Sequence, residues 1–171
     1  TGNDAETDCV ACGAGKYSNV TASPSSTTCL KCVAGTYLET TGNDDLQFTG
    51  AISETACTRC AAGKHSTTLG AVSSDTCENC VPGKYSTSVG AQSDAVCLDC
   101  TAGKFSASYG ADMQDKCNLC GTGKYSTSVG ADSANACQDC DVGKYLSIEG
   151  ASAGSMCVDC DRGKYSTALA A

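Results

Sequence analysis

Large apolar side chains are scarce in this chain and never recur with the period of an amphipathic helix. Leu, Ile, Val and Phe together number 22 of 171 residues, and no stretch places them three and four residues apart over several turns. Short runs such as 84–89 and 124–129 combine Ser, Thr, Tyr and Val between two glycines, a composition typical of brief strands. The pattern therefore predicts short β-strands joined by turns, with little or no helix.

Cysteine is the residue that gives the sequence its order. Cys-x-x-Cys pairs occur at 9/12, 29/32, 57/60, 77/80, 97/100, 117/120, 137/140 and 157/160. Successive pairs are 20 residues apart, except for the 28-residue step from Cys29 to Cys57. A fixed period of this length indicates a tandem array, in which one small unit is copied and stacked.

The period divides the whole chain into repeats. Residues 1–8 are the back end of a preceding repeat, full repeats follow at 9–28, 29–56, 57–76, 77–96, 97–116, 117–136 and 137–156, and a truncated repeat occupies 157–171. The second repeat carries an insertion near 43–50. We expect a tolerated surface loop there, because added loop length costs little. Its acidic residues leave a recognition loop or a weak calcium site as the alternative.

Composition indicates how such small units are stabilised. With a net charge of −8 and so few large apolar residues, a chain would normally stay disordered. The 16 cysteines supply another source of stability, because crosslinks restrict the unfolded ensemble where a hydrophobic core is thin. We therefore predict small disulfide-rich repeats in an elongated solenoid-like rod, in an oxidising extracellular or cell-surface setting.

Glycines and one aromatic residue recur at fixed positions in the units. Gly follows the second Cys by three residues throughout, and a second Gly recurs at 42, 70, 90, 110, 130 and 150; both predict turns. Two residues after the first Gly lies a structural aromatic ladder, and we expect each ring to supply most of the burial in its unit. Its members are Tyr17, Tyr37, His65, Tyr85, Phe105, Tyr125, Tyr145 and Tyr165.

Lysine precedes the aromatic position in all units but the second, where Thr36 replaces it. These lysines could pair with acidic residues between the paired cysteines, such as Asp99, Asp139 and Asp159. Exposed ion pairs are usually worth less than about 1 kcal/mol. We therefore expect a solvated row of lysines that keeps the array soluble.

The run Cys-x-x-Cys-x-x-Gly-Lys-Tyr-Ser, present as 77–86 and 117–126, resembles the ephrin-receptor-like cysteine-rich repeats of extracellular proteins and, more distantly, the modules of tumour-necrosis-factor receptors. The resemblance covers every unit. It implies disulfides that join the second Cys of one pair to the first Cys of the next: Cys12–Cys29, Cys32–Cys57, Cys60–Cys77, Cys80–Cys97, Cys100–Cys117, Cys120–Cys137 and Cys140–Cys157. Cys9 and Cys160 would then have disulfide partners outside this sequence.

A second connectivity stays open on the sequence alone. First cysteines can pair with first and second with second, as in Cys9–Cys29 and Cys12–Cys32, which satisfies all 16 internally. Neither end of the sequence shows a distinct capping repeat, although arrays normally need polar caps. We expect either continuation of a longer chain or self-association head to tail into an open filament.

Most other functions lack the residues they need. Cys-x-x-Cys pairs 20 residues apart also suit zinc ribbons, but identical spacing through every unit offers no division into separate sites, so we expect no metal or other cofactor. His65 is the only histidine and takes a ladder position, so no catalytic triad is expected and we predict no enzyme. The acidic balance opposes nucleic-acid binding, and no apolar run is long enough for a membrane span.

Asn19 begins the sequence Asn-Val-Thr, an acceptor for N-glycosylation. Covalent glycans at Asn19, and on surface Ser and Thr, fit an extracellular location. We therefore expect a structural extracellular repeat segment that forms the shaft or protomer of a surface filament, appendage or stalk. The alternative is a ligand-binding receptor or adhesion ectodomain built from the same modules.

Overall fold

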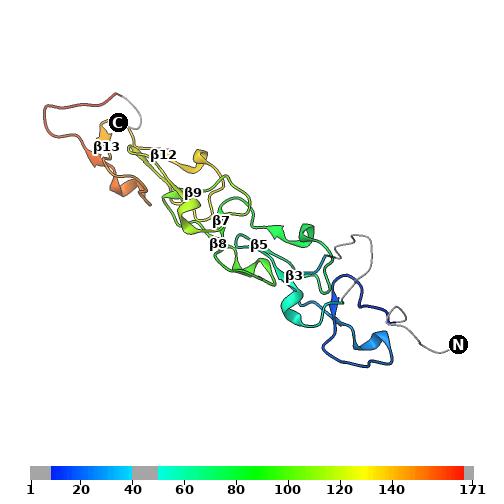
Figure 1. Cartoon of the computed structure of the whole chain (residues 1–171). Coiled ribbons are helices and arrows are strands. Elements are labelled where there is room, and N and C mark those ends of the chain that lie inside the picture. Colours follow the sequence, from blue (N-terminus) through cyan, green and yellow to red (C-terminus); the bar gives the residue numbers. More distant parts are fainter. Residues whose placement is uncertain (1–8, 40–49, 168–171) are drawn as a thin grey trace. The chain divides into compact units, whose positions relative to one another are not determined.

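The structure is a computed structural model that describes residues 9–39 and 50–167. These residues form small repeats of short paired strands and turns, crosslinked by seven disulfides (Figure 1). The only helical elements in the described ranges are three-residue 3₁₀ helices. The predicted class of small disulfide-rich repeats with short strands and little helix is confirmed.

The described residues divide into two compact units. One comprises 9–39, 50–61, 65–78 and 89–93, and the other comprises 62–64, 79–88 and 94–167. The same local design recurs in both units, so one repeat describes the others.

Every strand is two residues long. The strands are β1 (Lys16–Tyr17), β2 (Leu30–Lys31), β3 (Thr36–Tyr37), β4 (Thr58–Arg59), β5 (Lys64–His65), β6 (Glu78–Asn79), β7 (Lys84–Tyr85), β8 (Leu98–Asp99), β9 (Lys104–Phe105), β10 (Asn118–Leu119), β11 (Lys124–Tyr125), β12 (Gln138–Asp139), β13 (Lys144–Tyr145) and β14 (Val158–Asp159). Antiparallel pairs within the units are β1–β2, β3–β4, β7–β8, β9–β10, β11–β12 and β13–β14. Isolated strands this short are not stable, so each pair depends on the crosslink beside it.

The disulfide and the strand pair close the same loop. In the compact unit that contains residues 94–167, β9 pairs with β10, which consists of the two residues between Cys117 and Cys120. Cys100 is bonded to Cys117, with their Cα atoms 5.7 Å apart. On its other side, Phe105 forms a parallel bridge to Ala131. Strand β9 therefore pairs with the residues between one cysteine pair and also contacts the back half of the following repeat.

A 3₁₀ helix precedes the first Cys of most pairs. These helices span Ser26–Thr28, Glu54–Ala56, Ser74–Thr76, Asp94–Val96, Gln114–Lys116, Ala134–Ala136 and Gly154–Met156. Ser73 caps one of them, since its side chain accepts a hydrogen bond from the N–H of Asp75 at 3.1 Å. The cap residues have extended backbone, so the chain turns sharply into each helix.

The predicted turn glycines are confirmed. Those after each cysteine pair have φ between 70 and 83°, and the second set at 70, 90, 110, 130 and 150 has φ between 66 and 73°; Gly42 lies outside the described residues. At Gly83 the requirement is also one of space, because a Cβ there would lie 2.7 Å from the carbonyl carbon of Gly130. Only glycine allows the two backbones to approach this closely.

The expectation that the aromatic ring supplies most of the burial is wrong. Tyr145 and Tyr165 are exposed, and the other described ladder members are partly buried, although the side chain of His65 is only 12% exposed. The most buried side chains are instead the second cysteines, the serines after the ring and the alanines after the second glycine: Cys32, Cys60, Cys80, Cys100, Cys120, Cys140, Ser66, Ser86, Ser106, Ser126, Ala71, Ala111 and Ala151. The centre of each repeat therefore holds small side chains, and the larger rings lie at its margin.

The insertion precedes the back half of the second repeat. Ser18 N–H donates to Ala51 O at 2.9 Å, as Ser86 N–H donates to Ala111 O at 2.9 Å. Gly50 and Ala51 therefore take the positions of Gly110 and Ala111. The remainder of the predicted 43–50 insertion, with the acidic residues of the proposed calcium site, lies outside the described residues, as do residues 1–8 and 168–171.

Candidate functional site: a repeated serine turn and the first repeat

The seven disulfides join the second Cys of one pair to the first of the next. They are Cys12–Cys29, Cys32–Cys57, Cys60–Cys77, Cys80–Cys97, Cys100–Cys117, Cys120–Cys137 and Cys140–Cys157. This is the pairing that the resemblance implies, and not the first-with-first alternative. Cys9 and Cys160 are free thiols, Cys9 being exposed. A protein with this many disulfides belongs in an oxidising, secreted or extracellular setting.

Three lysines form ion pairs across the strands, contrary to the expected solvated row. Lys84 Nζ lies 2.6 Å from Asp99 Oδ1, Lys144 Nζ lies 2.7 Å from Asp159 Oδ1, and Lys124 pairs with Asp139. The hydrogen bond to Asp159, and then its charge, raise the pKa of Lys144 above the ordinary 10.5. This contribution to stability is therefore present below pH 10.5 and is lost as the pH rises through the folded pKa. Partly exposed pairs of this kind contribute little.

A buried serine after the ring organises a turn that the sequence interpretation missed. Ser66 Oγ accepts a hydrogen bond from Thr68 N–H at 3.3 Å, and Ser86 Oγ accepts one from Ser88 N–H at 3.2 Å. Ser126 Oγ does the same for Ser128 N–H at 3.3 Å. The recurrence of serine directly after the aromatic residue was the sequence signal that could have predicted this turn. The turn leaves one residue at its tip, between the serine and the donor.

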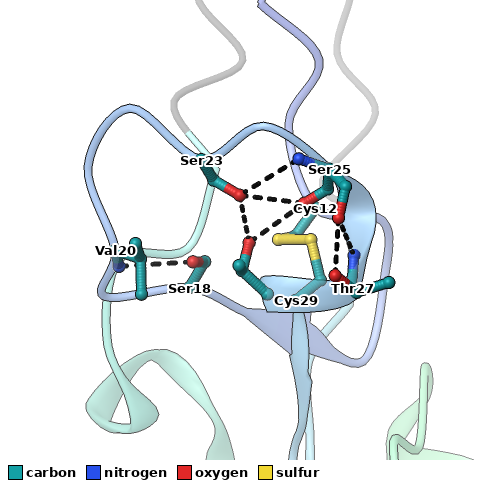
Figure 2. Close-up of a disulfide and its surroundings, with 8 residues drawn as sticks. Cys12, Ser18, Val20, Ser23, Ser25, Thr27 and Cys29 are labelled. Atoms are coloured by element: carbon teal, nitrogen blue, oxygen red, sulfur yellow. Dashed lines mark hydrogen bonds between the residues drawn. A yellow bond between two sulfur atoms is a disulfide. The ribbon is translucent and has the colours of Figure 1, made fainter.

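Asn19 occupies the tip of the same turn in the first repeat. Val20 N–H donates to Ser18 Oγ at 3.3 Å (Figure 2), and Asn19 and Thr21 are both exposed. The predicted glycosylation acceptor is therefore accessible, on a backbone held by its own serine.

Ser106 occupies the same position without a hydrogen-bond partner for its Oγ among the described residues, although the side chain is fully buried. We expect Ser86→Ala to lower the free energy of unfolding by about 1 kcal/mol, because a partly buried hydrogen bond is lost. Ser106→Ala is expected to leave it unchanged or raise it, because an unpaired buried hydroxyl is removed. Thermal unfolding of both variants followed by circular dichroism measures the difference. Equal losses would contradict the assignment.

The first repeat departs from the other copies around its disulfide. Figure 2 shows the hydroxyls around the Cys12–Cys29 bond: Ser23 Oγ lies 2.6 Å from Thr28 Oγ1, and Ser25 Oγ lies 2.5 Å from Thr27 Oγ1. An open hollow of about 620 Å³ is lined by Ser23, Ser25 and Thr28, the disulfide, Lys16 and Ile52. Lys16 is directly opposite Lys31 in the strand pair, where later repeats place Lys opposite Asp. The hollow thus combines hydroxyl donors with a cationic and an apolar group.

Ala22 is the only described residue other than glycine with a positive φ, at 53°. It takes the position of the second glycine, since the 3₁₀ helix Ser26–Thr28 follows it as Asp94–Val96 follows Gly90. An alanine in this conformation costs about 1 kcal/mol.

We therefore expect Ala22→Gly to raise the free energy of unfolding by about 0.5 to 1 kcal/mol. Ala95→Gly is the matched control, because Ala95 is exposed and lacks a positive φ. That exchange should be neutral or destabilising, since glycine gains chain entropy on unfolding. Urea unfolding measures both, and stabilisation by Ala95→Gly alone would contradict the argument.

No group of three or more His, Cys, Asp or Glu side chains suited to a metal ion occurs in 9–39 and 50–167. Within the same ranges, no helix is long and apolar enough to cross a membrane. His65 Nε2 lies 3.9 Å from Glu78 Oε2, and its ring is largely buried. No family model and no curated protein matches the chain.

Proposed function

We propose that this chain is a structural, non-catalytic segment that forms the shaft or protomer of a surface filament, appendage or stalk. The observation that carries the proposal is the exposure of its large apolar residues. Among the described Leu, Ile, Val and Phe residues, only Leu146 is buried. Contacts with other copies would remove this apolar surface from water, which is favourable.

The exposed apolar residues recur at one position of the repeat. The residue before the second glycine is Leu69, Val89, Tyr109 or Val129, with 62, 57, 69 and 65% of its surface exposed. Because the same group recurs in successive copies, any contact that one makes can be repeated along an assembly. This supports self-association over recognition of a single ligand.

The free cysteines support continuation of the array beyond one chain. Cys160 is the second of its pair and Cys9 the first of its pair, so they are the two types that each disulfide joins. A bond from Cys160 of one copy to Cys9 of another would reproduce the internal rule and join copies head to tail. If the array continues within a longer chain, Cys9 and Cys160 would bond to neighbouring repeats in the same way, second cysteine to first. The resemblance to ephrin-receptor-like repeats is compatible with either arrangement.

A receptor or adhesion ectodomain is the second candidate, and the hollow of the first repeat favours it. The open hollow of about 620 Å³ beside the Cys12–Cys29 disulfide brings hydroxyls, Lys16 and Ile52 to one surface of the first repeat. Under this proposal the first repeat binds a ligand, and the others hold it away from the surface.

Electron microscopy of material from the native source distinguishes the two proposals. We expect polymers; discrete single chains would overturn the filament proposal. In the isolated 171-residue chain, Tyr109→Ser with Val129→Ser should reduce self-association in sedimentation. Thr101→Ser with Asp112→Ser, which changes two exposed residues elsewhere in the repeat, should leave it unchanged.

A further inference from the structure

The serine turn presents chemically related residues at its tip in four repeats. The hydrogen bonds from Val20, Thr68, Ser88 and Ser128 N–H to the preceding serine are 3.3, 3.3, 3.2 and 3.3 Å long. The tip residues are Asn19, Thr67, Thr87 and Thr127, and all four are exposed. In one copy the tip is therefore an amide acceptor in the Asn-Val-Thr sequence, and in three it is a threonine hydroxyl.

The three tip hydroxyls have no internal task. The described structure shows no hydrogen bond to the Oγ1 of Thr67, Thr87 or Thr127. By contrast, Thr76 Oγ1 donates to Ser73 O at 2.8 Å, and Thr36 Oγ1 donates to Val33 O at 2.8 Å. The serines that hold the turns are fully or almost fully buried. A transferase can therefore reach the tips without disturbing the fold, while the serines that hold the turns are covered.

We propose that Thr67, Thr87 and Thr127 are O-glycosylation sites, presented by the same turn that presents Asn19. The donor is a nucleotide-activated sugar. Thr Oγ1 forms a bond to the anomeric carbon, the bond from that carbon to the nucleoside diphosphate breaks, and the hydroxyl proton passes to a base of the transferase. No oxidant or reductant is needed. The sugar projects into solvent from a backbone fixed by a partly buried hydrogen bond.

Two repeats serve as internal controls within the same chain. In repeat 97–116 the tip residue is Ala107, which has no hydroxyl, and Ser106 makes no turn hydrogen bond. In repeat 137–156 the buried serine is replaced by Leu146, so Ser147 follows no serine turn. The inference does not depend on filament formation, because a single chain would carry sugars at the same tips.

Glycopeptide mass spectrometry tests the proposal on protein isolated from its native source. The reduced protein is digested, and electron-transfer fragmentation locates each sugar. We expect sugars on Thr67, Thr87 and Thr127, and none on Ser66, Ser86 or Ser126. Unmodified tip threonines would overturn the proposal, and so would sugars spread over exposed Ser and Thr residues regardless of position.

Variants of the chain, secreted from a host in which the wild-type tips are modified, test the role of the turn. Thr87→Ala should remove the sugar from its peptide, and Thr76→Ala should leave that sugar in place. Ala107→Thr places a hydroxyl in the repeat that lacks the turn bond. We expect it to be occupied at least several-fold less than Thr87. Equal occupancy would show that the sequence position alone directs the transferase and would overturn the role of the serine turn.

Discussion

Replacing Cys100 and Cys117 together by alanine is expected to lower the local free energy of opening by about 3 kcal/mol. The bond between them closes a loop with a sequence separation of 17, and a crosslink over about 15 residues is worth about 3 kcal/mol through the entropy of the unfolded chain. Few large apolar contacts are present to compensate. Native-state amide hydrogen exchange measures the loss at Cys120 N–H and Gly130 N–H, which donate to Gly103 O and Cys100 O, both at 2.8 Å.

Cys160→Ala is the control for this experiment, because Cys160 has no disulfide partner within the described residues. Its loss should change the opening free energy of the same amides by less than about 0.5 kcal/mol. The double variant should leave exchange in 29–39 and 50–57 unchanged, since repeats are stabilised locally and through nearby copies. Full protection of Cys120 N–H in the double variant would contradict the claim that disulfides replace the core.

Gly103→Ala is expected to cost about 3 kcal/mol. The φ of Gly103 is 82°, and a Cβ there would lie 2.7 Å from the carbonyl carbon of Gly150. Left-handed backbone costs alanine about 1 kcal/mol, and overpacking against fixed backbone typically adds about 1 to 3 kcal/mol. Hydrogen exchange at Gly103 N–H, which donates to Ser126 O at 2.8 Å, measures the effect.

Gly143→Ala separates the two contributions. Gly143 has nearly the same φ, 78°, but a Cβ there would meet no described atom within 4 Å. Only the conformational cost of about 1 kcal/mol is therefore expected. Similar losses in the two variants would mean that backbone conformation accounts for the requirement and that the close approach to Gly150 does not matter.

The repeat, the turns and the strands could be predicted because each depends on a chemically distinctive residue. Cysteine spacing determined the repeat, and glycine determined the turns, since no other residue tolerates both the φ and the approach found at Gly83. The disulfide pairing had two solutions on spacing alone, and only the resemblance favoured the one observed. The recurring cysteine pairs and glycines were therefore enough to predict most of the fold.

The interior could not be predicted because its residues are small and common. Ser86 and Ala111 are nearly inaccessible. Serine and alanine are also common on surfaces, so the recurrence of serine after the ring and of alanine after the second glycine gave no sign of burial. The ring was the natural choice for a core residue, yet small side chains occupy the centre of the repeat. The sequence motif predicted Asn19 as a glycosylation acceptor, but the turn on which it lies depends on the Oγ of Ser18, which only the structure reveals.

The glycine after each of the first five cysteine pairs contacts the second glycine of the repeat two places further along the chain. Gly63 lies against Gly110 and Gly83 against Gly130, and the spacing adjusts for the insertion where Gly15 meets Gly70. Three consecutive copies are therefore the smallest block that contains every type of contact. A coding sequence that gains or loses one whole copy restores equivalent partners at the junction. Such chains can change length in evolution by recombination between copies without a new fold being required.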